Sequence, residues 1–180
     1  IALERRKQNA PKYRDFEKDG DLTIVDDIFQ QRKQLADILI RIEDTGLLDR
    51  IGVDPLGLGL IADEIESRVD GSGRQVIEHD RIVGIAQGYK MTGATKTLGV
   101  MVAGNTLLHS GQPMMAWCIG NARVEQHGNA ISITKQASGQ AKIDPLVASI
   151  CATALMAMNP EARSKKSVYA GMTVEQIQER

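Results

Sequence analysis

Residues 50–69, RIGVDPLGLGLIADEIESRV, contain a strand, a turn and a helix in immediate succession. The apolar run at residues 50–54 predicts a buried strand, and the Pro and Gly residues of 55–59 predict the turn after it. The pattern of residues 60–69 predicts a helix that continues to about Val69. A strand that leads directly into a helix indicates an α/β architecture. Asp54 stands where this strand ends, and ligands of open α/β sheets gather just beyond the carboxyl ends of strands.

The pattern outside this stretch predicts the same architecture. Asp26 and Asp27 can cap a helix with an apolar face at near-helical period, and Gly46 is a plausible end for it. The hairpin is marked by two alternating stretches joined at residues 127–129. The other expected elements are a partly helical segment at 1–20 that docks through its two aromatic rings, strands at 21–25 and 82–86, and helices at 94–109 and 144–158. This order predicts one α/β layer domain with a partly parallel sheet at residues 1–158, followed by a polar tail at 159–180.

The amino-acid composition is that of a single globular domain. The chain has 180 residues, 42% of them hydrophobic, which is enough for one domain with a real core. A formal net charge of −1 gives no basic footprint for nucleic acid, but a nuclease can recruit positive charge as metal ions held by acidic residues. Cys118 and Cys151 lack zinc spacing and indicate buried free thiols in a reducing compartment. No membrane span or signal peptide is apparent, and a start at Ile1 suggests a piece of something longer.

Asp54 and Asp144 are the candidate metal ligands. Asp54 precedes Pro55, so it can instead cap the turn, and Asp144 opens a helix, so it can instead be an N-cap. The helix after Asp144 is almost entirely small or apolar, which predicts that it lies buried and holds its first turn rigidly. Mg²⁺ and Mn²⁺ prefer oxygen ligands from one or two carboxylates and substrate phosphates. Two such ions can activate water and stabilise a leaving oxygen, although this scheme normally uses a third carboxylate.

Lys135 and Lys142 are candidate contacts for a phosphate near these carboxylates. Lys135 ends the second strand of the hairpin, nine residues before Asp144, and a solvated loop lysine is the equal alternative. Residues 57–62 match the dinucleotide fingerprint G-x-G-x-x-A, but the acid expected at the end of the next strand is replaced by Gln87. A dinucleotide-binding enzyme therefore stays a weaker hypothesis. Residues 93–97 lack the glycines of a phosphate-binding loop.

Taken in order, these residues resemble the C-terminal nuclease domain of tailed-phage terminase large subunits. The match covers most of the chain, from about Tyr13 to Met158, and its ordered set is more specific than any single piece. The residues that carry it are Tyr13, Gly20-Asp21-Leu22, Val25-Asp26, Ile51 to Asp54, Gln87-Gly88, His109, Pro113 to Trp117, Asn121-Ala122, the hairpin, Lys135 and Lys142-Ile143-Asp144.

The resemblance implies an RNase H-like fold with a mixed central sheet flanked by helices and a β-hairpin. It also implies a Mg²⁺- or Mn²⁺-dependent endonuclease that cuts double-stranded DNA during packaging, with Asp54 and Asp144 as its second and third acidic positions. The family's first acid stands on an opening strand upstream, so N-terminal strands and the third ligand are expected to be missing here. The implied partners are double-stranded DNA, the ATPase domain of the same polypeptide, the portal and the small terminase subunit, in the host cell cytoplasm. A non-catalytic assembly or binding module on the same fold is the alternative.

Overall fold

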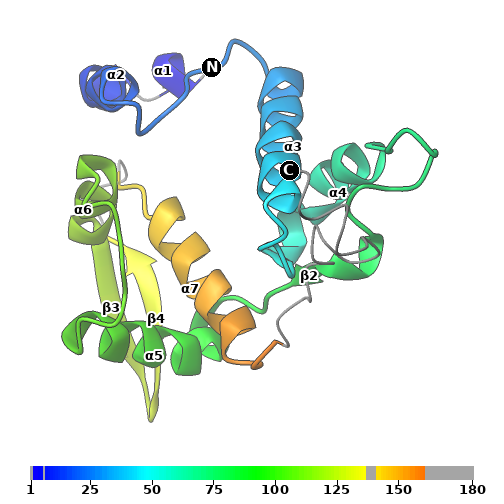
Figure 1. Ribbon diagram of the computed structural model, residues 1–180. Helices are drawn as coiled ribbons and strands as arrows, with labels where there is room; N and C mark the ends of the chain where they lie inside the picture. Colours follow the sequence, from blue (N-terminus) through cyan, green and yellow to red (C-terminus); the bar gives the residue numbers. More distant parts are fainter. Residues whose placement is uncertain (1, 6, 137–140, 161–180) are drawn as a thin grey trace, which may run out of the picture.

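The computed structural model describes residues 2–5, 7–136 and 141–160 and is a mixed helix and strand structure (Figure 1). Its strands are short, and most of the described chain is helical. The α-helices are α1 (Ala2–Arg5), α2 (Ala10–Lys18), α3 (Ile28–Asp44), α4 (Leu58–Glu66), α5 (Thr92–Ala103), α6 (Pro113–Gly120) and α7 (Asp144–Met156). The strands are β1 (Ile51–Val53), β2 (Ile82–Gly84), β3 (Ala122–His127) and β4 (Ala130–Lys135). The 3-10 helices are η1 (Lys7–Asn9), η2 (Pro55–Gly57), η3 (His79–Arg81) and η4 (Gly88–Met91).

The strands form two separate sheets. β1 and β2 pair in parallel, with Ile51 opposite Ile82, and β3 and β4 form the predicted antiparallel hairpin around Gly128. The prediction of one mixed central sheet is therefore wrong for the described residues. At the outer edge of β4, the Thr92 hydroxyl accepts the Ile131 N–H at 3.0 Å and lies 2.9 Å from the Ile131 carbonyl oxygen. At Ile131, a side chain therefore takes the place that the backbone of a third strand would occupy.

Apolar side chains cover both faces of the β1–β2 sheet, as a parallel sheet requires. On one face, α3 and α4 contribute a cluster that includes Ala36, Ala62 and Ile65. On the other face, α5 and α7 contribute a cluster that includes Leu98 and Ile150. In Figure 1, α3 and α4 accordingly lie on one side of the strands and α7 on the other. The position of α7 against β1 matters most for the candidate site.

The N-terminal segment docks through its aromatic rings, as predicted. Tyr13 and Phe16 of α2 are buried, and their rings lie 6.1 and 5.6 Å from the ring of Trp117 in α6. The expected strand at residues 21–25 is wrong, because this stretch is irregular. Some of its backbone donors are already used: Leu22 donates to the Phe16 carbonyl and Ile24 donates to the Glu17 carboxylate.

Several element ends were predicted correctly and others were not. Asp27 caps α3 by accepting the Gln30 N–H at 2.8 Å, and Gly46 follows the helix with a positive φ of 68°. The helix expected to reach Val69 ends at Glu66. The helix expected at 94–109 is α5 and ends at Ala103, because Asn105 has a left-handed φ of 53° that a helix cannot continue through.

Both cysteines are free and buried, as the sequence predicts. No helix among the described residues is long and apolar enough to cross a membrane. The expected polar tail falls largely on residues 161–180, outside the described residues.

Candidate functional site

Asp54 lies at the carboxyl end of β1, where the sequence places it. Its side chain is exposed, and its Oδ1 accepts the backbone N–H of Leu56 at 3.0 Å. Asp54 therefore caps the turn, which is the alternative role that the sequence suggested. The bond uses only one of its two carboxylate oxygens. A carboxylate can hold its turn through one oxygen and offer the other to a cation.

Asp144 is the first residue of α7 and is not the N-cap. Ile143 occupies the cap position and no side chain caps the helix there. The Asp144 side chain is 67% exposed, and its Oδ2 lies 3.7 Å from the Nζ of Lys142. Because the capping role considered for it is not used, the carboxylate remains available to a ligand from solvent.

The two candidate lysines differ in their surroundings. Lys142 is half-buried and reaches Asp144, so these two predicted site residues are brought together. Lys135 is the exposed last residue of β4 and lies opposite Ala122 in the hairpin register. Since Ala122 follows Asn121, and Asn121 donates to the Lys142 carbonyl at 3.1 Å, one hydrogen bond links the end of the hairpin to the entry of α7.

Asp54 and Asp144 are connected through the packing of α7 on β1. A Cβ added at Gly52 would meet the Leu155 Cδ1 at 3.1 Å and the Cys151 Cβ at 3.5 Å, so helix and strand approach closely there. From Cys151 back to Asp144 the helix rises roughly 10 Å. Asp54 and Asp144 therefore belong to two elements, β1 and α7, that pack against each other. Neither carboxylate lies at the Gly52 contact itself.

The entry of α7 also lies against α6. Burial raises the pKa of the Cys118 thiol, the negative charge of Asp144 raises it further and Lys142 lowers it. These charges act on Cys118 because the three residues are neighbours. The start of α7 is thus supported from the side of α6 by a fully buried residue.

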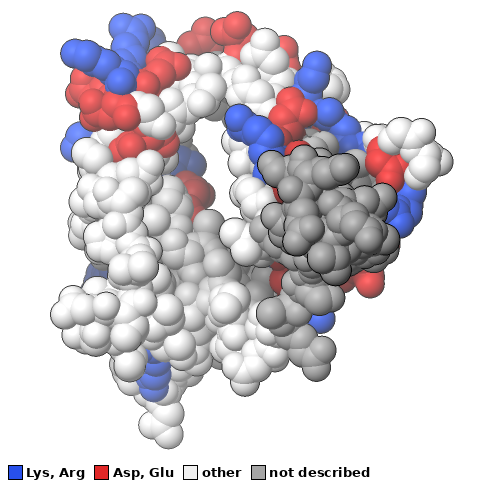
Figure 2. Space-filling model, viewed as in Figure 1, with Lys and Arg blue, Asp and Glu red and all other residues white. Residues whose placement is uncertain are grey.

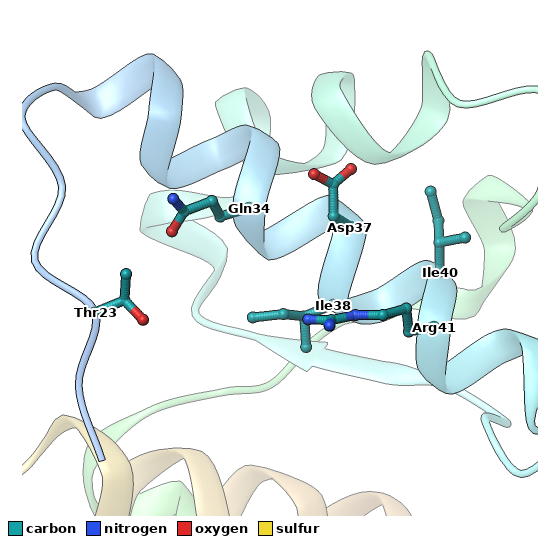
Figure 3. A pocket seen from close by; sticks show the side chains of 6 residues that line it. All are labelled: Thr23, Gln34, Asp37, Ile38, Ile40 and Arg41. Carbon is teal, nitrogen blue, oxygen red and sulfur yellow. The ribbon is translucent and has the colours of Figure 1, made fainter. Parts of the chain in front are cut away.

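The surface is hollowed near this region. Figure 2 shows an opening between the surface over α2 and α6 and the surface over α3, and α7 borders it in the same view in Figure 1. Charged side chains gather over α2, α3 and α4 on this face, whereas the surface over α5 and α6 is mostly uncharged (Figure 2). A pocket of about 560 Å³ lies between Thr23 and α3 (Figure 3), but neither Asp54 nor Asp144 lines it. The pocket is therefore not the candidate metal site.

The donor chemistry fits a hard divalent cation in part. Two exposed carboxylates supply the oxygen atoms that Mg²⁺ and Mn²⁺ prefer. Across residues 2–5, 7–136 and 141–160, however, no group of three or more His, Cys, Asp or Glu side chains is placed to hold a metal ion. The residues present thus fit two ligands of a site, and a complete two-ion site needs more.

Sequence reasoning did not predict the structural roles of Asn121, which bonds to the entry of α7, and Gly52, which allows α7 to approach β1. Both lie in stretches that carried the family resemblance, but a resemblance does not say what a side chain contacts. For Gly52, a glycine inside an apolar strand is a signal of close backbone approach that was available in the sequence.

Comparison with known proteins identifies the family of this chain. Residues 2–160 match the family model described as the terminase large subunit, endonuclease domain. A search of the curated proteins found no match. The crystal structure of the HK97 bacteriophage large terminase is similar in fold, with a TM-score of 0.62 and 20% sequence identity over 84% of this chain. The matched region is 30% of that terminase, so this chain spans less than a third of its length. Because the family model covers most of the chain, the protein belongs to the family of terminase large subunit endonuclease domains.

Proposed function

We propose that this chain is the metal-dependent endonuclease domain of a phage DNA-packaging terminase and that it cuts double-stranded DNA by two-metal phosphodiester hydrolysis. Family membership supports the nuclease role. The observation that carries the site assignment is Asp144, an exposed carboxylate in the first turn of α7 that does not serve as the helix cap. An RNase H-like fold is part of the same proposal.

In this proposal, the Asp54 and Asp144 carboxylates would hold Mg²⁺ or Mn²⁺. Bound divalent ions supply an activated water and stabilisation of the leaving oxygen. Lys142 offsets the negative charge of Asp144 in the free protein, since its ammonium lies 3.7 Å from the carboxylate. In the same proposal, Lys142 and the exposed Lys135 would donate to the oxygens of a substrate phosphate.

The site needs a third carboxylate, and we propose that another segment of a longer polypeptide provides it. Two observations support this: the described residues contain no group of three ligands, and the chain corresponds to 30% of the HK97 terminase. The same polypeptide would carry an ATPase domain. The proposed partners are double-stranded DNA, the portal and the small terminase subunit, in the cytoplasm of the host cell.

Plasmid cleavage with Mn²⁺ tests the proposal in the full-length polypeptide that carries this domain. We expect Asp54→Ala and Asp144→Ala each to lower the cleavage rate at least a hundredfold, because each removes a ligand of the ions that carry the chemistry. Asp63→Ala is the matched control, since Asp63 is an exposed acid of α4 outside the proposed site. Cleavage by both variants at the unsubstituted rate would contradict the assignment.

A second candidate function is a non-catalytic packaging or assembly module on the same fold. It is favoured by the lack of a three-ligand group in the part of the chain that the structure describes. Titration calorimetry with Mn²⁺ separates the two functions. For the nuclease, we expect the full-length polypeptide to show a heat of Mn²⁺ binding that Asp144→Ala abolishes. If no such heat is measured, the non-catalytic module is the better description.

A further inference from the structure

The entry of α7, defined as Lys142, Ile143 and Asp144, is held by a side chain from another element. Asn121 Nδ2 donates to the carbonyl oxygen of Lys142 at 3.1 Å, across 21 residues of sequence. Asn121 is half-buried and forms the C-cap of α6. The bond therefore ties the end of α6 to the residue two positions before the Asp144 carboxylate.

Asn121 is itself firmly placed. Its backbone N–H donates to the carbonyl oxygens of Trp117 and Cys118 at 3.1 and 3.2 Å, and its own carbonyl accepts the Gln136 N–H at 3.0 Å. Trp117 and Cys118 are anchored in turn, the first against the rings of α2 and the second by complete burial. Because Asn121 is held in place in this way, its side chain can fix the position of the Lys142 carbonyl to which it donates.

Few other directional contacts from outside the helix hold the first turn of α7. No side chain caps the helix, and its first turn is closed by the Val147 N–H donating to the Ile143 carbonyl at 3.0 Å. Burial of Ile143 holds the entry in the core but does not select its orientation, because apolar contacts are non-directional. The Asn121 bond is directional and fixes the Lys142 carbonyl.

We propose that Asn121 is a positioning residue of the nuclease: by holding the Lys142 carbonyl, it orients the first turn of α7 and so places the Asp144 carboxylate for its cation. The inference rests on the proposed role of Asp144 as a metal ligand. Groups that orient ligands in this way contribute to metal affinity without touching the metal, and their loss typically lowers affinity about 10- to 100-fold.

Two substitutions test this inference in the full-length polypeptide. Asn121→Ala removes the donor, and Asn121→Asp keeps the shape of the side chain but replaces the donor by acceptors only. We expect both to raise the dissociation constant for Mn²⁺ about tenfold in calorimetry and to lower kcat for plasmid cleavage more than they raise KM. Asn121→Asp is the sharper variant, because a general charge effect would strengthen cation binding whereas a positioning effect weakens it.

Hydrogen exchange provides a readout that does not depend on metal or activity. We expect Asn121→Ala to speed amide exchange in a peptide covering residues 143–150, while thermal melting shows that the rest of the protein stays folded. Gln136→Ala is the matched control: its side chain donates to the Gly120 carbonyl at 2.8 Å at the same end of α6 but does not contact the entry of α7. It should leave exchange at residues 143–150 and Mn²⁺ affinity unchanged.

The outcomes separate this inference from the proposed function. Unchanged Mn²⁺ affinity in both Asn121 variants, or tighter binding by Asn121→Asp, overturns the positioning role while Asp144 remains a ligand. Unchanged exchange at residues 143–150 also overturns it. If the unsubstituted polypeptide binds no Mn²⁺, the proposed function fails and the inference fails with it.

Discussion

Arg81 shows how one buried charge organises the side of the sheet opposite the candidate site. The residue is 5% exposed, and its guanidinium donates to both carboxylate oxygens of Glu43 and to the carbonyl oxygens of Leu48 and Asp49. The hydrogen bond to Glu43 raises the pKa of Arg81, so the charge is retained at any physiological pH. This side chain joins the end of α3, the approach to β1 and the start of β2.

At this residue we predict that Arg81→Ala lowers the free energy of unfolding by about 3–5 kcal/mol, because it removes a buried guanidinium that donates to Glu43 and to the carbonyl oxygens of Leu48 and Asp49. Urea denaturation followed by circular dichroism measures the change. Arg74→Ala is the control, since the Arg74 side chain is 78% exposed and its ion pair with Asp70 is screened by solvent, so its loss should change the stability little. A loss for Arg81→Ala as small as that of the control would contradict the prediction.

At the scale of elements, the contact between β1 and α7 decides where the two candidate ligands stand. Gly52 permits this contact because the space for its Cβ is taken by the Ile85 and Leu155 side chains, each at 3.1 Å. A Cβ at this position would require the ends of the Ile85 and Leu155 side chains to shift by a few tenths of an ångström. Because Gly52 has no side chain, α7, which begins with Asp144, can pack closely against β1, which Asp54 follows.

We predict that Gly52→Ala destabilises the fold by about 1–3 kcal/mol, the typical cost of overpacking a close contact. It should also weaken Mn²⁺ binding by the full-length polypeptide, because the contact strains Leu155 of α7, the helix that carries Asp144. Gly59→Ala is the matched control, since nothing lies within 4 Å of its added Cβ and alanine suits a helix better than glycine. If Gly52→Ala is as stable as the unsubstituted protein in thermal melting, the packing argument is wrong.

At the scale of the whole molecule, the described residues hold three apolar groups that are separate from one another. Two are the core clusters on either face of the β1–β2 sheet, and the third is the aromatic contact of α2 with Trp117. In Figure 1, α1 and α2 sit over α6, away from the strands β1 and β2. Such a segment is expected to open locally without loss of the main cores.

We predict that Trp117→Ala releases α2 selectively, because it removes the ring on which both Tyr13 and Phe16 pack. Limited trypsin digestion should then cut at Lys12, Arg14 or Lys18 much faster, while amide exchange at Ile65 and Ile150 stays slow. Tyr89→Ala is the control, since Tyr89 is 58% exposed and takes no part in this contact. Uniformly faster exchange throughout the protein would show instead that α2 and the cores unfold together.

Local pattern was enough to predict most of the helices and strands. The hairpin, the Asp27 cap and the apolar helix after Asp144 follow from short-range rules about alternation, capping and periodicity. The strand at 21–25 failed because some of its donors bond to α2, a partner that no local pattern reveals. The single mixed sheet failed because strand pairing is a contact between distant segments, and among the described residues β3 and β4 pair with each other rather than with β1 or β2.

The sequence by itself determined the α/β class, the free buried cysteines and the resemblance to terminase nuclease domains, which the family match confirms. These depend on residue type and order along the chain. Only the tertiary structure decided that Asp144 is not a cap, that Gly52 admits α7 and that Asn121 grips the Lys142 carbonyl. Each of these depends on contacts between segments far apart in sequence, where close packing selects one neighbour among many that the sequence allows.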